Sequence, residues 1–161
     1  MKILSDEFFM NEAIKEAEKA FEENEVPIGA VIVKDKIIIA RAHNQVRRLR
    51  DPTAHAEILA VTQACQALGS PYLEDCHLYV TVEPCIMCTG AVLHARIGTI
   101  YYGVEEPMYG ALGSRIDLSK EFSSSLRKIE SGLLRERAQD LLQVFFRRCR
   151  SINKMERWLS G

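Results

Sequence analysis

The chain has 161 residues, of which 47% are hydrophobic and 27% are charged, a composition typical of one soluble globular domain. Its net charge of −1 gives no sign of general affinity for nucleic acid, and no run reaches the roughly 20 apolar residues that span a bilayer. Because no long apolar run follows a basic stretch at the N-terminus, we expect no secretory signal and a cytoplasmic protein without a membrane segment.

The first part of the chain predicts a helix followed by a β-hairpin. Apolar residues recur at helical spacing over residues 6–24. The nearly continuous apolar run 28–33 predicts a buried strand, and the turn at 34–36 leads into a second strand over 37–42. Asp51-Pro52 then predicts the start of a helix that continues to residue 68 and ends at Gly69.

The second part alternates strands and helices. We expect a strand over 76–82, a helix from Pro84 to about residue 95, and a strand over 99–103. A short strand near 128–129 and a long amphipathic helix from about 134 to 158 follow. This alternation predicts a three-layer α/β/α fold around a mixed central sheet. No linker or repeat divides the chain, so we expect a single domain over residues 1–161.

Three side chains suit a zinc ion: His55, Cys85 and Cys88. The histidine and the two cysteines fall at predicted helix starts, where free N–H groups and partial positive charge favour thiolates. Two thiolates and one imidazole match zinc in softness and charge. Three protein ligands leave a fourth position for water, which is the arrangement of catalytic sites. The remaining cysteines, Cys65, Cys76 and Cys149, are expected to be small buried residues.

Glu57 is the candidate proton carrier beside this site. Zinc lowers the pKa of a bound water from about 15.7 to about 7, and the resulting hydroxide still needs a partner that moves protons. His55 and Glu57 are two positions apart, which separates them by about 200° around a helix. They can therefore reach one site only at the end or flank of a first helical turn.

Basic residues concentrate at the C-terminus. Residues 127–161 hold nine Lys/Arg and four Asp/Glu, a net charge of +5, which leaves −6 for the rest of the chain. Arg147, Arg148 and Arg150 are candidates for phosphate contacts; the alternative is a solvated face paired with Glu136 and Asp140. Of the three aromatic residues on this helix we expect most to lie in the core, and one to be free to stack on a base: Phe145, Phe146 and Trp158. A second basic cluster lies in the first half of the chain: Arg41, Arg47, Arg48 and Arg50.

The pattern H-x-E followed by P-C-x-x-C is the signature of zinc-dependent nucleobase deaminases. Beyond it, the chain resembles the tRNA-specific adenosine deaminases of bacteria from about residue 8 to residue 150. The resemblance is carried by residues 26–31 (VPIGAV), 43–44 (HN), 51–57 (DPTAHAE), 79–85 (YVTVEPC), 110–114 (GALGS) and 145–147 (FFR).

This resemblance implies a cytidine-deaminase-like fold, a homodimer with one zinc ion per subunit, and hydrolysis of the wobble adenosine of a tRNA anticodon stem-loop to inosine. It assigns zinc binding to His55, Cys85 and Cys88, and the proton shuttle to Glu57. It also assigns contacts with the target base to three further residues: Asn44, Val26 and Ala56.

Two segments depart from the family pattern. Residues 124–127 read Ser-Ser-Leu-Arg where the family usually has Asn-His-Arg, and residues 105–109 are acidic where a Lys often stands. Both changes affect how the protein would contact RNA and leave the residues of the deamination reaction unchanged.

Two other functions remain open from the sequence. One is a deaminase of free bases or nucleotides of the guanine, cytosine or pterin type, against which the basic tail and the loop 110–114 argue. The other is a non-catalytic zinc-containing RNA-binding subunit, which would need a fourth ligand or the loss of Glu57.

Overall fold

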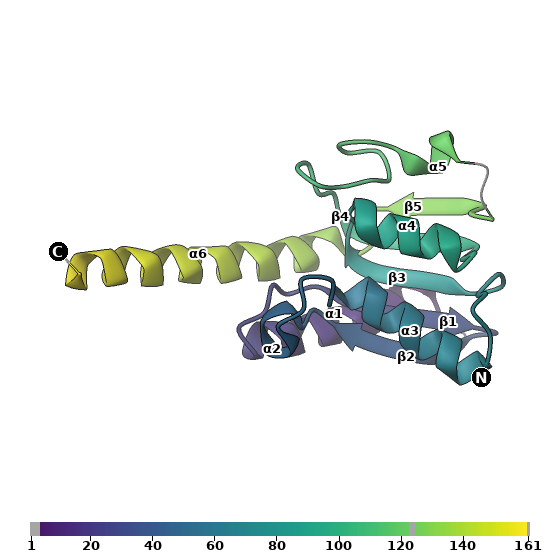
Figure 1. Ribbon diagram of the computed structural model, residues 1–161, viewed down its shortest axis with the longest axis horizontal. Coiled ribbons are helices and arrows are strands. Elements are labelled where there is room, and N and C mark those ends of the chain that lie inside the picture. Colours follow the sequence, from purple (N-terminus) through teal and green to yellow (C-terminus); the bar gives the residue numbers. More distant parts are fainter. Residues whose placement is uncertain (1–3, 123–124, 161) are drawn as a thin grey trace.

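The computed structural model describes residues 4–122 and 125–160. A five-stranded sheet has the order β2-β1-β3-β4-β5, as Figure 1 shows. Its strands are β1 (Gly29–Lys34), β2 (Ile37–His43), β3 (His77–Val82), β4 (Thr99–Val104) and β5 (Lys128–Ser131). The β1–β2 and β1–β3 pairs are antiparallel, whereas β3–β4 and β4–β5 are parallel. The sheet is mixed, as predicted.

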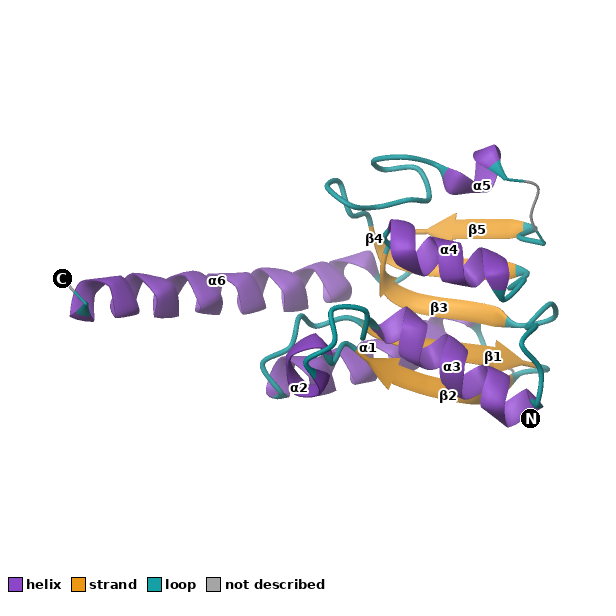
Figure 2. Ribbon diagram, viewed as in Figure 1, coloured by secondary structure: helices purple, strands orange, loops and turns teal. Residues whose placement is uncertain are grey.

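Helices cover both faces of the sheet, which confirms the three-layer α/β/α fold (Figure 2). One layer contains α1 (Asp6–Glu22) and the start of α6 (Arg135–Leu159), and the other contains α3 (Ala56–Leu68) and α4 (Ile86–His94). Each layer has its own apolar core. Phe9 and Met10 of α1 pack on Tyr79 and Tyr101, while alanines of α3 pack on the opposite side of the same strands.

The helix predicted at Asp51-Pro52 begins later than expected. Asp51 Oδ1 accepts hydrogen bonds from the amide and hydroxyl of Thr53, which closes a turn, and α3 starts at Ala56. Similarly, Pro84 does not open a helix, because Cys85 is the N-cap of α4. Two short helices were not predicted: α2 (Val46–Leu49) and α5 (Leu118–Glu121).

The helix α6 leaves the body of the protein and projects alone (Figure 1). Phe145 is buried, but Phe146 is 44% exposed and Trp158 is 83% exposed. The expectation that most of these aromatic residues lie in the core is therefore wrong. The reason is that α6 extends beyond the sheet, so its outer part has no core to pack against. Among the described residues, no helix combines the length and the hydropathy that a membrane span needs.

Candidate metal centre and substrate pocket

His55 and Glu57 reach the same site because His55 stands outside the helix that follows it. His55 is the N-cap of α3 and has an extended backbone, with φ −74° and ψ 153°. Glu57 lies in the first turn of α3. The angular separation that a continuous helix would impose therefore does not apply, and both side chains line one cavity.

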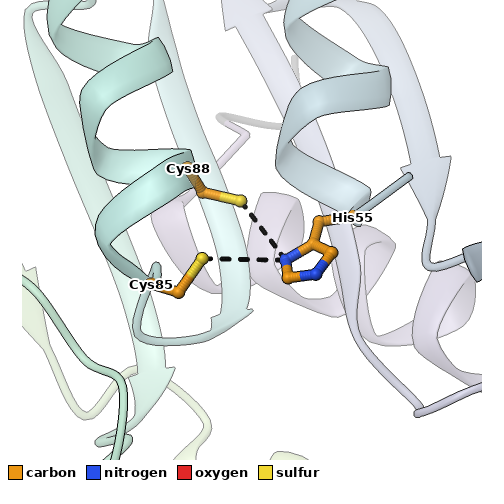
Figure 3. Close-up of side chains that lie close together, drawn as sticks. All are labelled: His55, Cys85 and Cys88. Carbon is orange, nitrogen blue, oxygen red and sulfur yellow. Dashed lines mark hydrogen bonds between the residues drawn. The ribbon is translucent and has the colours of Figure 1, made fainter. Parts of the chain in front are cut away.

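Cys85 and Cys88 come from the equivalent place on the neighbouring helix. Cys85 is the N-cap of α4 and Cys88 lies in its first turn. His55 Nδ1 is 3.7 Å from Cys85 Sγ and 3.5 Å from Cys88 Sγ (Figure 3). The three donor atoms all lie within 4.8 Å of one another.

These distances fit a zinc ion. Bonds of about 2.3 Å to sulfur and about 2.0–2.1 Å to nitrogen in a tetrahedron separate a sulfur from a nitrogen by about 3.6 Å. The observed sulfur–nitrogen distances lie at this value without rearrangement. His55, Cys85 and Cys88 would thus hold zinc and leave one position open.

The ionisation of the cysteines at this site favours binding of a cation. The hydrogen bond from the Cys88 thiol, together with the one to His55, lowers the pKa of Cys85 to about 4. The same contact with Cys85, together with burial, raises the pKa of Cys88. A metal ion that binds here would displace the remaining thiol proton, because both cysteines coordinate as thiolates.

Glu57 is a buried acid with a free acceptor atom. It is 4% exposed, and burial raises its pKa to about 7. Its Oε2 has no hydrogen-bond partner in the described part of the chain. A carboxyl group whose pKa lies near neutrality can both take and release a proton under physiological conditions, so Glu57 is suited to proton transfer and is not needed as a ligand.

A cavity of about 490 Å³ lies beside the metal centre, a volume in the range of small-molecule sites. Of the predicted base contacts, Asn44 and Val26 line this cavity, and Asn44 is only 5% exposed. Ala56 is fully buried in the apolar core and is not among the lining residues.

Several lining residues were missed by the sequence analysis. They come from the unpredicted α2, from the acidic loop and from the first residue of α4: Val46, Arg47, Glu106, Tyr109 and Ile86. Arg47 had been noted only as part of a basic cluster. No periodic pattern could have found these residues, because short helices and loops have none.

The candidate RNA contacts on α6 divide into two groups. The guanidinium of Arg148 donates to Phe21 O and Asn24 Oδ1 and lies 4.4 Å from the centre of the Phe21 ring. Arg148 therefore ties α6 to α1. Arg147 and Arg150 are exposed and, within residues 4–122 and 125–160, form no ion pair with Glu136 or Asp140; together with Phe146 they lie on the outer surface of α6.

The two departures from the family pattern lie in different places. The acidic loop borders the cavity through Glu106, whereas Glu105 is paired with Arg135 of α6. In the segment 124–127, residue 124 lies outside the described residues. Arg127 donates to the carbonyl of Glu74, so its side chain is held by the loop before β3.

Comparison with known proteins gives three findings of direct relevance. Residues 4–104 match the family described as the cytidine and deoxycytidylate deaminase zinc-binding region. The tRNA-specific adenosine deaminase of Aquifex aeolicus (strain VF5) is 43% identical over 148 residues, which is 92% of this chain and 98% of its own length. A solved structure from studies of A-to-I editing by tRNA:A34 deaminases at the wobble position of transfer RNA has a TM-score of 0.76 and 42% identity, covering 83% of this chain and 98% of that chain.

A guanine deaminase from Bacillus subtilis is also similar. Its structure has a TM-score of 0.60 and 37% identity, and the match covers 70% of this chain and 82% of that chain. These two similar structures are thus described as deaminases of adenosine 34 of tRNA and of guanine, respectively.

Proposed function

The chain belongs to the zinc-binding cytidine and deoxycytidylate deaminase family, and on this premise we propose that it hydrolyses adenosine to inosine at the wobble position of a tRNA anticodon, with release of ammonia. The observation that carries the proposal is that Glu57 lines one cavity with His55 and Cys85, two of the three side chains that lie close enough together to hold a metal ion. The relatives that are similar over almost their whole length favour adenosine in tRNA as the substrate.

The chemistry divides between the metal and one side chain. Bound zinc supplies a Lewis acid that activates water for attack. Glu57 would take a proton from the attacking water on Oε2, which has no hydrogen-bond partner among the described residues. It would deliver this proton to the ring nitrogen, and would then move the second proton of the water, from the new hydroxyl group, to the departing amine. A carbon–oxygen bond forms, the carbon–nitrogen bond breaks, and ammonia leaves.

Asn44 holds the target base by a hydrogen bond to its edge, since a base that has left its stack must be recognised inside the pocket. We expect Asn44→Ala to reduce kcat/KM on an anticodon stem-loop by about 5- to 150-fold, which corresponds to the roughly 1–3 kcal/mol cost of losing such a contact. Zinc content should not change. Wild-type kinetics on RNA together with normal zinc would remove Asn44 from the binding site.

The exposed side chains of α6 contact the RNA backbone in this proposal. Arg147 and Arg150 are without acidic partners among the described residues, and Phe146 lies between them and the body of the protein on the same helix. Phosphate contacts fix the register of an RNA without reading its sequence. Such contacts release counterions, so affinity should fall steeply with salt.

The double variant Arg147→Gln/Arg150→Gln tests this contact. We expect weaker binding of the stem-loop and a salt dependence that is shallower by up to about 1.4–1.8, at roughly 0.7–0.9 per lost contact. Lys15→Gln/Arg96→Gln is the matched control, because it removes the same charge from two residues that are paired with acidic side chains, Lys15 with Glu12 and Arg96 with Glu74. Equal effects of the two variants would show that only overall charge matters.

The protein acts as a homodimer in this proposal. An apolar patch supports it: Gly90 and Leu93 of α4 border a hollow with Leu118 and Phe122, and Phe122 is 59% exposed. Exposed apolar surface of this kind marks association sites. Light scattering should give twice the chain mass, and Phe122→Asp should reduce it; a monomer at micromolar concentration would refute the dimer.

Inosine formation on a panel of anticodon stem-loops, with free guanine and free adenine as competing substrates, tests the function itself. Turnover on a stem-loop and not on free bases supports the proposal. The reverse result would favour a free-base deaminase, for which the similar guanine deaminase is the specific reason. RNA binding without ammonia release would indicate a non-catalytic subunit.

The protein is cytoplasmic in this proposal. The five free cysteines and a tRNA substrate fit the reducing cytoplasm. Cell fractionation would test this localisation.

A further inference from the structure

Glu83 is a buried carboxylate to which the chemistry described above gives no role. It follows the last residue of β3 and precedes Pro84 and Cys85, and it is only 2% exposed. Its amide donates to Val104 O at 2.8 Å, which joins the ends of β3 and β4. A charged group in such a place needs compensating hydrogen bonds, because burial of an unpaired carboxylate is strongly unfavourable.

Those hydrogen bonds all come from one segment. Glu83 Oε1 accepts from the amides of Leu112, at 2.9 Å, and Ser114, at 3.1 Å. Glu83 Oε2 accepts from the amide of Glu106, at 3.1 Å, and from the Ser114 hydroxyl. A carboxylate has about four acceptor positions, so residues 106–114, here called the wall segment, occupy all of them.

The wall segment also lies directly against the backbone next to the metal ligand. The amide of Ala111 donates to Pro84 O at 3.0 Å. A β-carbon on Gly110 would lie 2.6 Å from the Glu83 carboxyl group and 2.4 Å from Glu106 O, which is closer than atoms can approach. Glycine at position 110 is therefore what lets the wall segment close over Glu83.

The wall segment carries two side chains into the substrate cavity, Glu106 and Tyr109. We propose that Glu83 is a positioning residue, which fastens the wall segment to the end of β3 and so determines how tightly the target nucleoside is held. The inference rests on the proposed function of the cavity. It assigns Glu83 to substrate binding and leaves the proton transfer to Glu57.

Glu83→Gln is the first test. Glutamine keeps one acceptor oxygen but turns an NH₂ group toward the Glu106 amide, so the hydrogen bond from that amide is lost and two donors face each other. We expect KM for the stem-loop to rise roughly ten- to hundred-fold, while kcat changes much less and zinc content stays normal. A merely structural role would lower zinc content, stability and kcat together and would leave no such division between KM and kcat.

A double-mutant cycle shows whether Glu83 acts through the wall segment. Tyr109→Ala should raise KM in the wild-type background, because Tyr109 lines the cavity. In the Glu83→Gln background it should add little, since the segment is already displaced; coupled residues are non-additive in this way. Full additivity would overturn the inference.

Ser114→Ala keeps the test decisive if Glu83→Gln does not fold. Ser114 is exposed, and the substitution removes only its hydroxyl hydrogen bond to Glu83. We expect a smaller rise of KM, of several-fold, with normal zinc. If the wild-type enzyme turns over the stem-loop and KM is unchanged in every folded variant, the inference is overturned. Failure of the proposed function would appear differently, as absence of turnover by the wild-type enzyme on any stem-loop.

Discussion

Glu57→Gln should lower kcat for deamination by at least about 10²–10⁴-fold, the range expected when a general acid–base group is removed. Glutamine has nearly the same shape as glutamate but cannot carry a proton. Glu57 is not needed as a metal ligand, because His55, Cys85 and Cys88 already bring three donor atoms together. Zinc content and RNA affinity should therefore remain close to those of the wild type, and single-turnover kinetics should locate the defect in the chemical step.

The matched control is Glu12→Gln, which changes another largely buried carboxylate. Glu12 lies on α1 and is paired with Lys15 and Arg41, away from the cavity. Its substitution should leave turnover near normal. If Glu57→Gln also retained near-normal turnover, another group would have to move the protons, and the role proposed for Glu57 would be wrong.

Cys88→Ala should lose zinc and activity together. Cys88 is fully buried at the metal centre, and a site with only two remaining ligands binds zinc far more weakly. We expect zinc content to fall from one ion per chain to nearly none, and turnover to fall to background. Since metal binding contributes to folding free energy, the melting temperature should fall to that of the chelator-treated wild type, and added zinc should restore only the wild type.

Cys65→Ala is the control for this experiment, because Cys65 lies on α3, packs against the apolar core and is not part of the ligand cluster. It should retain zinc. Full zinc retention by Cys88→Ala would refute the assignment of the metal centre, whereas loss of zinc by both variants would indicate general misfolding.

The sequence alone predicted the layered α/β/α fold and the three side chains that lie close enough together to hold zinc, and it proposed Glu57 as the proton carrier. These depend on local information. Thiolate, imidazole and carboxyl chemistry belongs to individual side chains, and apolar periodicity identifies a strand such as 28–33 or a helix such as 6–24 wherever it occurs. Spacing alone was enough to bring Cys85 and Cys88 to one helix start.

The starts of the helices were decided by tertiary structure. Asp51-Pro52 has the composition of a helix start, yet Asp51 closes a turn with Thr53, and His55 and Cys85 are the N-caps. A capping preference is worth only about 1 kcal/mol, so packing of α3 and α4 on the sheet overrides it. The extended backbone of His55 that results is what lets His55 and Glu57 share one cavity.

The surroundings of the site also depended on long-range contacts. Glu83 is joined to residues 23–31 positions away, and Arg148 is held by Phe21 of α1 and by Asn24 just after it, both more than 120 positions away. No local pattern encodes such partners. The sequence by itself therefore determined which atoms can bind zinc and move protons, because this is a property of the side chains. Only the tertiary structure decided which loop closes the pocket and which arginines of α6 stay exposed, because those outcomes depend on where distant segments meet.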